Sequence, residues 1–275
     1  MAAPHDQHRG RHADERGRPL TLTGLPDLAP VLAEQQRDGH PLLFATVSGA
    51  HLYGFPSRDS DVDLRGVHLL PAADLVGLRE PDETRSRMWF HDGVEMDLVT
   101  HDLRKFARLL LRRNGYVLEQ LLSPLVAHTT DVHAELVALA PGVLTRHHAH
   151  HYRGFARTQW RLHEKNRELK PLLYTYRVLL TGIHLMRSGK VVADLRELAD
   201  AVPEAPDRLA GLIEAKADAE HGTAEGLAGA DATAEEIAAL HGVLDEAQTA
   251  SALPDQPSAR DALHDLVVRA RLGDA

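Results

Sequence analysis

The sequence contains no cysteine among its 275 residues, and aromatic residues make up only 4% of it. Without cysteine the chain has no disulfide bonds and no thiolate metal ligands, which suits a reducing cytoplasm. So few aromatic residues require a core built mainly from Leu, Val and Ala. No apolar run approaches the roughly 18 residues that a membrane-spanning helix needs. We therefore expect a cytoplasmic protein without a membrane partner.

The charge of the chain is unevenly distributed. The net charge of −9 argues against broad, non-specific binding of nucleic acid. Between Arg146 and Arg177, however, eight Lys or Arg residues stand against two Glu residues. From Asp194 to Ala275, eighteen Asp or Glu residues stand against six Lys or Arg residues. A basic centre beside an acidic C-terminal third favours a local anionic ligand.

Three strands are predicted in the first half of the chain. The short apolar run at residues 42–47 fits a buried strand, and residues 61–69 alternate polar and apolar side chains as a half-buried strand does. Residues 94–100 predict a third strand. Residues 89–91 are expected to pair with this strand across Asp92-Gly93, which is a favoured hairpin turn.

Helical periodicity dominates the chain after Asp102, whose carboxylate suits the first turn of a helix. A short helix is predicted over residues 26–37, and a helix break is predicted at Lys170-Pro171. Residues 1–19 lack the apolar segment of a secretory signal and predict a flexible polar tail. The sequence thus predicts an α+β fold, with a small mixed sheet in a catalytic domain over residues 20–130 and an all-helical domain over residues 131–275.

Two carboxylates stand two residues apart in the second predicted strand. Residues at this spacing project from the same face of a strand, so Asp61 and Asp63 lie side by side while Val62 and Leu64 face the core. A capped turn would explain Asp61, because Asp and Ser favour such positions. Asp63 is harder to explain in this way, since a carboxylate within an apolar strand is costly unless it is paired or binds a metal.

A third carboxylate follows in the strand at residues 94–100. Asp97 is placed to join Asp61 and Asp63, and Glu95 on the same face is the alternative. Carboxylate oxygens suit Mg²⁺, which completes its coordination with water and phosphate oxygens. Three carboxylates would allow two ions, Mg²⁺ or Mn²⁺, to hold both the attacking and the leaving oxygen of a phosphoryl-type transfer.

A Ser-Gly pair directly follows the first predicted strand. Gly49 lets backbone N–H groups approach a phosphate closely, and the hydroxyl of Ser48 can donate to it as well. The segment has neither the paired glycines of a dinucleotide-binding turn nor the Gly-Lys-Ser/Thr of a P-loop. The pair therefore indicates a different kind of phosphate turn.

These motifs together resemble the DNA polymerase β-type nucleotidyltransferase superfamily, and within it the RlaP-like branch associated with RNA repair. The resemblance rests on SGAHLYG at residues 48–54 and DSDVDLRGV at residues 59–67. It extends through THDLRKF at residues 100–106, Asn114-Gly115 and EQL at residues 119–121. The resemblance implies a palm-like sheet domain, with Asp61, Asp63 and Asp97 as catalytic metal ligands and Ser48 and Gly49 at the triphosphate.

The function implied by this resemblance is transfer of a nucleoside monophosphate from an NTP, with ATP as the expected donor, to an acceptor hydroxyl. RNA is the expected acceptor, and RNA-repair enzymes are the expected partners. Three alternatives stay open: a small-molecule acceptor, a protein hydroxyl as acceptor, and a relic domain that binds nucleotide or RNA without turnover.

Several basic residues are secondary candidates for contacts with phosphate. Lys170, Tyr174 and Arg177 share one helix face, and the resemblance implies nucleotide contacts for them. Lys105 is either another nucleotide contact or a surface lysine. A stripe with a spacing of four residues forms either an RNA-binding or phosphate-binding surface or a solvated helix face; it comprises Arg153, Arg157, Arg161 and Lys165. The histidines at residues 147–151 are expected at the exposed start of a helix.

Overall fold

The computed structural model describes residues 25, 28–30, 32–33, 40–57, 60–78, 80–217 and 230–273. Its strands are β1 (Leu42–Val47), β2 (Val62–His68), β3 (Thr84–His91), β4 (Val94–Asp102) and β5 (Val126–His128). Around the sheet lie α2 (Gly49–Leu52), α3 (Ala72–Val76), α4 (Leu103–Leu111), α5 (Gly115–Leu121) and α6 (Asp131–Leu139). Further along the chain come α7 (Ala149–Asn166), α8 (Leu169–Ser188), α9 (Leu195–Ala201), α10 (Leu209–Ala217), α11 (Ala230–Ala250) and α12 (Arg260–Leu272).

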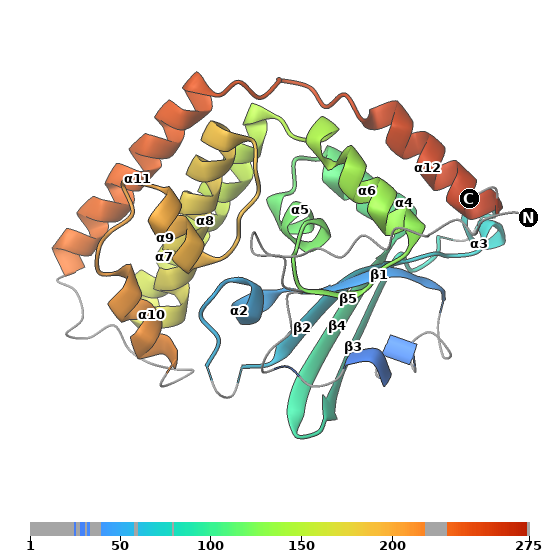
Figure 1. Ribbon diagram of the computed structural model, residues 1–275, viewed down its shortest axis with the longest axis horizontal. Helices are drawn as coiled ribbons and strands as arrows, with labels where there is room; N and C mark the ends of the chain where they lie inside the picture. Colours follow the sequence, from blue (N-terminus) through green and yellow to red (C-terminus); the bar gives the residue numbers. More distant parts are fainter. Residues whose placement is uncertain are drawn as a thin grey trace, which may run out of the picture.

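The strands form one mixed sheet in the order β3-β4-β2-β1-β5 (Figure 1). Strands β2 and β4 run parallel, and the other neighbours are antiparallel. The predicted strands and the hairpin are present, with Asp92 at φ 50° and Gly93 at φ 82°, as a tight hairpin turn requires. The predicted α+β class, a mixed sheet followed by helices, is confirmed.

The two faces of the sheet contribute to different hydrophobic clusters. Phe44 and Val67 pack with residues of α4, α5 and α6, which cover one face in Figure 1. Val62 and Leu64 point to the opposite face, where Leu28 belongs to the same cluster. The side chains of Asp63, Arg65 and Asp97 alternate with these apolar residues, so they project from the face that the helices cover.

The helices after β5 pack beside and above the sheet. Helices α7, α8 and α11 contact one another, and α12 returns to pack on α4 and α6 (Figure 1). One cluster of buried apolar side chains runs from β1 to α12. The division into two domains at residue 130 stays a prediction. None of the helices in the described part of the chain is long and apolar enough to cross a lipid bilayer.

One detail of the helical prediction is wrong. The break predicted at Lys170-Pro171 lies earlier, because α7 ends at Asn166 and Arg167 adopts a left-handed φ of 56°. Pro171 lies in the first turn of α8, where its missing N–H costs nothing. In the described part of the helix predicted over residues 26–37, residues 28–30 and 32–33 are helical. The rest of that helix and the predicted tail lie outside the described residues.

The histidines at the start of α7 are only partly exposed, which corrects the expectation of an exposed helix start. His148 is fully buried and contacts Thr145 in a short 3₁₀ turn. Burial lowers the pKa of His148 to about 4, and it lowers the pKa of His151 to about 4 as well. These neutral rings belong to the packing between α7 and its neighbours.

Candidate active site

Two carboxylates face each other across neighbouring strands of the sheet. Asp63 on β2 and Asp97 on β4 are register partners in the parallel pair. Their side chains are 19% and 23% exposed, so both lie at the border between the protein interior and solvent. Glu95 lies two residues before Asp97, and it is Asp97 that stands opposite Asp63. This arrangement favours Asp97 over Glu95 as the third carboxylate.

An arginine that the sequence analysis did not single out joins these carboxylates. Arg65 Nη2 donates to Asp63 Oδ1 at 2.5 Å and to Asp97 Oδ2 at 2.9 Å. Its Nη1 donates to the backbone oxygens of Leu64 and Asp97, and its Nε donates to the hydroxyl of Tyr116. These five hydrogen bonds fix the guanidinium between the two carboxylates. The signal was present in the sequence, because Arg65 follows Asp63 at the same-face spacing of two residues.

The ionisation of Asp63 reflects this crowded environment. Burial raises the pKa of Asp63, and the charge of Arg65 opposes that rise. The neighbouring charges of Asp61 and Asp97 raise the pKa further, and the charge of Lys170 lowers it. The pKa of this carboxyl stays raised although an arginine is bonded to it. A bound cation would therefore stabilise the ionised carboxylate further.

The Ser-Gly turn lies directly against Asp63. The N–H of Ser48 donates to the backbone oxygen of Asp63 at 2.8 Å, and Gly49 opens α2 with a φ of 62°. A Cβ on Gly49 would lie 1.8 Å from Asp63 Oδ2, so only glycine fits beside this carboxylate. Within the described part of the chain, the buried Oγ of Ser48 has no hydrogen-bond partner. A buried polar atom of this kind favours a ligand or a water molecule.

Asp61 comes directly before β2, at the end of a tethered loop. Its charge acts on Asp63, which places the two carboxylates near each other. In this loop Ser57 and Ser60 share a hydrogen bond of 2.9 Å between their hydroxyls. Lys216 of α10, which is 1% exposed, donates to Ser57 Oγ at 3.2 Å. The helical part of the chain therefore helps to position the loop that carries Asp61, a contribution that the sequence analysis missed.

Helix α8 brings two of the predicted nucleotide contacts close to the carboxylates. Lys170 is near enough for its charge to lower the pKa of Asp63. Burial raises the pKa of Tyr174, and the charges of Asp63 and Asp61 add to that rise. The ring of Tyr174 packs edge-on against Tyr53, at 5.4 Å between centroids. Lys170 and Tyr174 are therefore close enough to the carboxylates for electrostatic interaction with them.

Arg177, one helical turn further along α8, is placed differently. Its side chain is 1% exposed and donates to Glu119 at 3.0 Å. The guanidinium carbon lies 3.7 Å from the centroid of the Tyr53 ring. Arg177 thus joins α8 to α5 within the core, and its guanidinium carbon lies 5.7 Å from the centroid of the Tyr174 ring.

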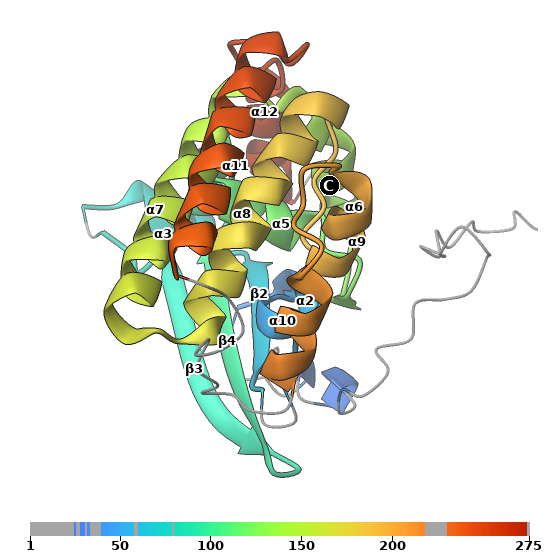
Figure 2. The same cartoon turned by 90° about the vertical axis from the view of Figure 1, so that its left-hand side faces the viewer.

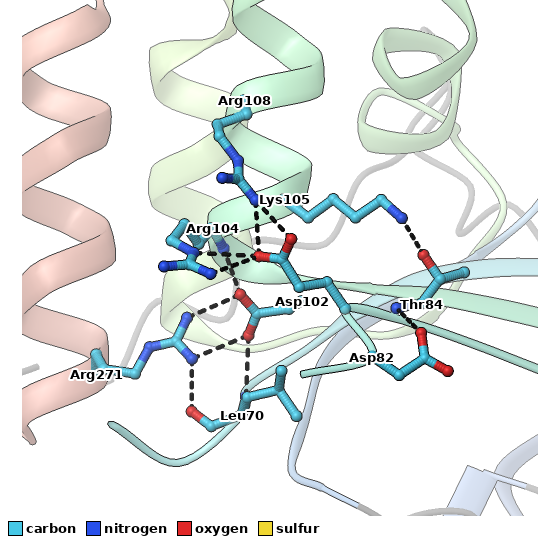
Figure 3. Close-up of polar contacts among 9 residues, drawn as sticks. Leu70, Asp82, Thr84, Asp102, Arg104, Lys105, Arg108 and Arg271 are labelled. Carbon is cyan, nitrogen blue, oxygen red and sulfur yellow. Dashed lines mark hydrogen bonds and ion pairs between the residues drawn. The ribbon is translucent and has the colours of Figure 1, made fainter. Parts of the chain in front are cut away.

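Lys105 of α4 extends towards Thr84 (Figure 3). Its Nζ donates to Thr84 Oγ1 at the start of β3, and Thr84 pairs with His101 of β4. His101 is four residues beyond Asp97, a distance of about 13 Å along a strand. The structure therefore does not bring Lys105 to the carboxylates.

The basic stripe of α7 begins against another helix. Arg153 forms an ion pair with Asp245 of α11 and donates to Gln248 at 2.8 Å. The charge of Arg157 acts on His241, which is also in α11. Arg161 and Lys165 are exposed at the end of α7. Arg153 therefore holds α11, whereas Arg157 is exposed, as Arg161 and Lys165 are.

The oxygen donors at this site suit a divalent cation. Mg²⁺ is commonly held by one or two carboxylates together with water and phosphate oxygens, and Asp61, Asp63 and Asp97 offer such ligands. The backbone N–H of Ser48, whose hydroxyl is buried, donates to the backbone oxygen of Asp63. As the described side chains are arranged, with Arg65 between two of the carboxylates, no three His, Asp or Glu residues form a ready metal cluster. The residues fit the ion chemically, and the number of ions stays a prediction.

Comparisons with known proteins agree with these features. The family described as "RlaP: RNA repair pathway DNA polymerase beta family" matches residues 26–269. The uncharacterized protein MJ0002 of Methanocaldococcus jannaschii is 32% identical over 158 residues, which cover 55% of this chain and 63% of that protein. The uncharacterized protein YcgL of Bacillus subtilis is 28% identical over 144 residues, covering 52% and 54%. The chain therefore spans less than two thirds of either relative.

One solved structure is also similar. A nucleotidyltransferase-like protein from Exiguobacterium sibiricum aligns with 81% of this chain and 73% of its own, at 13% identity and a TM-score of 0.33.

Proposed function

The chain belongs to the RNA repair pathway DNA polymerase beta family, and from this premise we propose that it transfers a nucleoside monophosphate from an NTP to an acceptor hydroxyl. In this reaction the acceptor oxygen forms a bond to the α-phosphorus, and the bond from that phosphorus to the bridging oxygen breaks. Pyrophosphate leaves, and the proton of the hydroxyl passes to a carboxylate or to water. ATP is the expected donor.

The observation that carries this proposal is the direct pairing of Asp63 with Asp97 beside the turn at Gly49. Neighbouring parallel strands hold the two carboxylates at a fixed spacing. The Gly49 turn leaves backbone close to them, with no side chain in between. Phosphoryl-type transfer depends chiefly on positioning and on neutralising charge, and both are available at such a site.

Each group has a role in the proposed reaction. Asp61, Asp63 and Asp97 would hold divalent ions, Mg²⁺ or Mn²⁺, which when bound would neutralise the charge of the phosphates. Ser48 and Gly49 would donate hydrogen bonds to the outer phosphates. Asp97 would accept the proton of the acceptor hydroxyl, directly or through water. A nucleotide between the sheet and α8 would meet Lys170 and Tyr174 on its other side.

RNA is the acceptor that we propose. The family description supports it, because it names an RNA repair pathway. RNA-repair enzymes are the expected partners in that setting. The exposed end of the α7 stripe, at Arg161 and Lys165, is compatible with an anionic polymer. Small molecules and protein hydroxyls are the alternative acceptors.

The test uses purified protein, Mg²⁺ or Mn²⁺, and each of the four NTPs labelled at the α-phosphate. Each NTP is incubated with pooled RNA and, in parallel, with protein alone. The Asp61→Ala/Asp63→Ala double variant serves as the inactive control. Label on RNA that depends on both aspartates supports the proposal and identifies the nucleotide. Label on the protein itself would replace RNA by a protein hydroxyl as the acceptor.

A second measurement separates binding from turnover. Metal-dependent NTP binding without transfer to RNA or protein would favour a small-molecule acceptor or a domain that binds without turnover. Transfer that is equally fast in the double variant would overturn the assignment of the site.

A further inference from the structure

Strand β3 exposes two large apolar side chains to solvent. Met88 is 67% exposed and Phe90 is 73% exposed, although both lie in regular β structure. Their neighbour Trp89 points to the opposite face, where it packs against a buried cluster. Isolated exposed apolar residues are common, but an adjacent pair on one strand face indicates a contact surface.

This exposed pair lies next to the catalytic carboxylates. Met88 is the register partner of Asp97, and Phe90 is the register partner of Glu95. Side chains directly opposite each other in an antiparallel pair share a face and lie about 5 Å apart at Cβ. Phe90 is therefore on the same face as Asp97, at the diagonal distance of about 7–8 Å. An acceptor group resting on Phe90 would have Asp97 within reach.

The hairpin of β3 and β4 is accessible to a long ligand. In Figures 1 and 2 it extends beyond the helices, with the turn at its far end. Strand β3 is an edge strand, with β4 as its neighbour in the sheet. A polymer could cross this edge without passing through the protein.

The reverse face of β3 carries positive charge. Arg85 and Arg87 alternate with the exposed apolar pair and line a hollow of about 490 Å³, with His68 and Thr100 on its inner side. The guanidinium carbon of Arg87 lies 5.3 Å from the centroid of the Trp89 ring. The edge of the sheet thus combines apolar groups near the carboxylates with guanidinium groups on the other side.

We propose that β3 is the binding surface for the acceptor end of single-stranded RNA. Phe90, supported by Met88, stacks on a base near the terminal hydroxyl, and Arg85 and Arg87 contact the backbone phosphates. Unpaired bases stack on exposed aromatic rings, and arginine contacts the phosphates that connect them. A purely apolar protein partner would not need the two arginines. The proposal rests on the proposed function and specifies how that function selects its acceptor.

The test measures the binding of a single-stranded RNA by fluorescence anisotropy in the absence of NTP. The RNA carries fluorescein at its 5′ end, so that its 3′ end is unmodified. Phe90→Ala should raise Kd roughly five- to 160-fold, because stacking is worth about 1–3 kcal/mol per base. Phe90→Trp should keep the affinity of the wild type, whereas Phe90→Leu should resemble Phe90→Ala. Leu78→Ala is the matched control, since Leu78 is fully exposed elsewhere on the surface.

A second arm examines the arginines through the salt dependence of binding. Each phosphate contact that is lost reduces the steepness with which affinity falls as salt rises. Arg85→Ala/Arg87→Ala should therefore weaken binding at low salt and flatten this dependence. Thermal unfolding of every variant is measured alongside to confirm that the fold is retained.

The outcomes separate this inference from the proposed function. If Phe90→Ala binds RNA as tightly as Leu78→Ala, or if the wild type binds no single-stranded RNA, the β3 surface is overturned. Nucleotide binding and transfer to another acceptor would then leave the proposed function standing. If Phe90→Leu binds as well as the wild type, the surface is apolar without stacking and the RNA assignment fails. Failure of the wild type to bind any NTP would overturn the proposed function itself.

Discussion

The parallel strands β2 and β4 have carboxylates bonded to an arginine at each end. The two ends differ in how many hydrogen bonds the carboxylates accept and in how deeply they are buried. At one end Arg65 lies between Asp63 and Asp97, within reach of solvent. At the other end Asp102 is fully buried and accepts two hydrogen bonds from Arg271 of α12 (Figure 3). It also accepts from the backbone N–H groups of Leu70 and Arg104.

The pKa shifts of the two aspartates follow this difference. Burial acts to raise the pKa of Asp102, but the hydrogen bonds from Arg271, Leu70 and Arg104 outweigh it and hold that pKa below the usual range. Burial raises the pKa of Asp63, and one arginine shared with a second carboxylate does not reverse the rise. The ionised form of Asp102 is therefore stabilised by the contacts that it makes within the protein. The ionised form of Asp63 would be stabilised further by additional positive charge nearby.

The largest expected effect comes from removing Asp63. Asp63→Asn should lower nucleotidyl transfer on the order of a thousand-fold or more, because a metal ligand and its charge are lost together. The unfolding temperature should stay the same or rise, since a partly buried charge is removed. Labelled-NTP transfer and thermal unfolding are measured side by side. The exposed Asp74→Asn is the matched control, and equal activity in the two variants would contradict a catalytic role for Asp63.

Removing Asp102 should have the opposite profile. Asp102→Ala leaves the guanidinium of Arg271, which is 8% exposed, without its partner and removes the N-cap of α4. The free energy of unfolding should fall by about 3–5 kcal/mol. Denaturant unfolding measures this loss. Glu204→Ala is the control, because the exposed pair of Glu204 with Arg187 should be worth at most about 1 kcal/mol.

A loss in Asp102→Ala no larger than in Glu204→Ala would mean that α12 is held by its apolar contacts alone. Asp102 and Arg271 would then not be a stabilising pair, and the two ends of the strands would not differ in this respect.

The sequence predicted the strands well, because strands depend on short-range patterns, and the catalytic role of the site residues stays a prediction. Alternation at residues 61–69 located β2, and the Asp92-Gly93 turn located the hairpin of β3 and β4. The parallel pairing of β2 with β4, which aligns Asp97 with Asp63, does not follow from that turn. The φ of 62° at Gly49 lies in the region that glycine favours, as the predicted turn requires, and the role of Ser48 and Gly49 at a phosphate stays a prediction. Family resemblance then supplied the chemistry, which periodicity cannot supply.

The sequence did not reveal contacts that depend on how distant segments pack. Nothing local distinguishes the buried Arg177 from the partly exposed Lys170, since both follow from the same helical spacing. The stripe of α7 could not be assigned to α11, because Asp245 is far away in the sequence. Arg65 is the exception. Its spacing of two residues from Asp63 predicts that both side chains lie on the same face of the strand. The alternation of polar and apolar residues, however, is equally typical of an ordinary polar residue at that position.

An intermediate effect is expected from Arg65. In Arg65→Ala, Asp63 and Asp97 face each other without a cation, so the metal-free protein should lose about 1–3 kcal/mol of stability. Added Mg²⁺ should raise the unfolding temperature of the variant more than that of the wild type. Arg187→Ala, which removes an exposed guanidinium, should respond to Mg²⁺ as the wild type does. An identical Mg²⁺ response in all three proteins would show that Arg65 does not neutralise the carboxylates.

The smallest expected effect is a pH dependence that originates at Asp102. Because the pKa of Asp102 in the folded protein is below its ordinary value of 3.8, its ionised form contributes stability at neutral pH. That contribution is fully present above the unfolded pKa and is lost as pH falls through the folded pKa. The difference in unfolding free energy between the wild type and Asp102→Asn should therefore be constant from pH 7 to about pH 5 and should narrow below 3.8. Denaturant unfolding across this range measures the difference. If this difference in unfolding free energy increased as the pH fell, the contacts of Asp102 would not stabilise its ionised form.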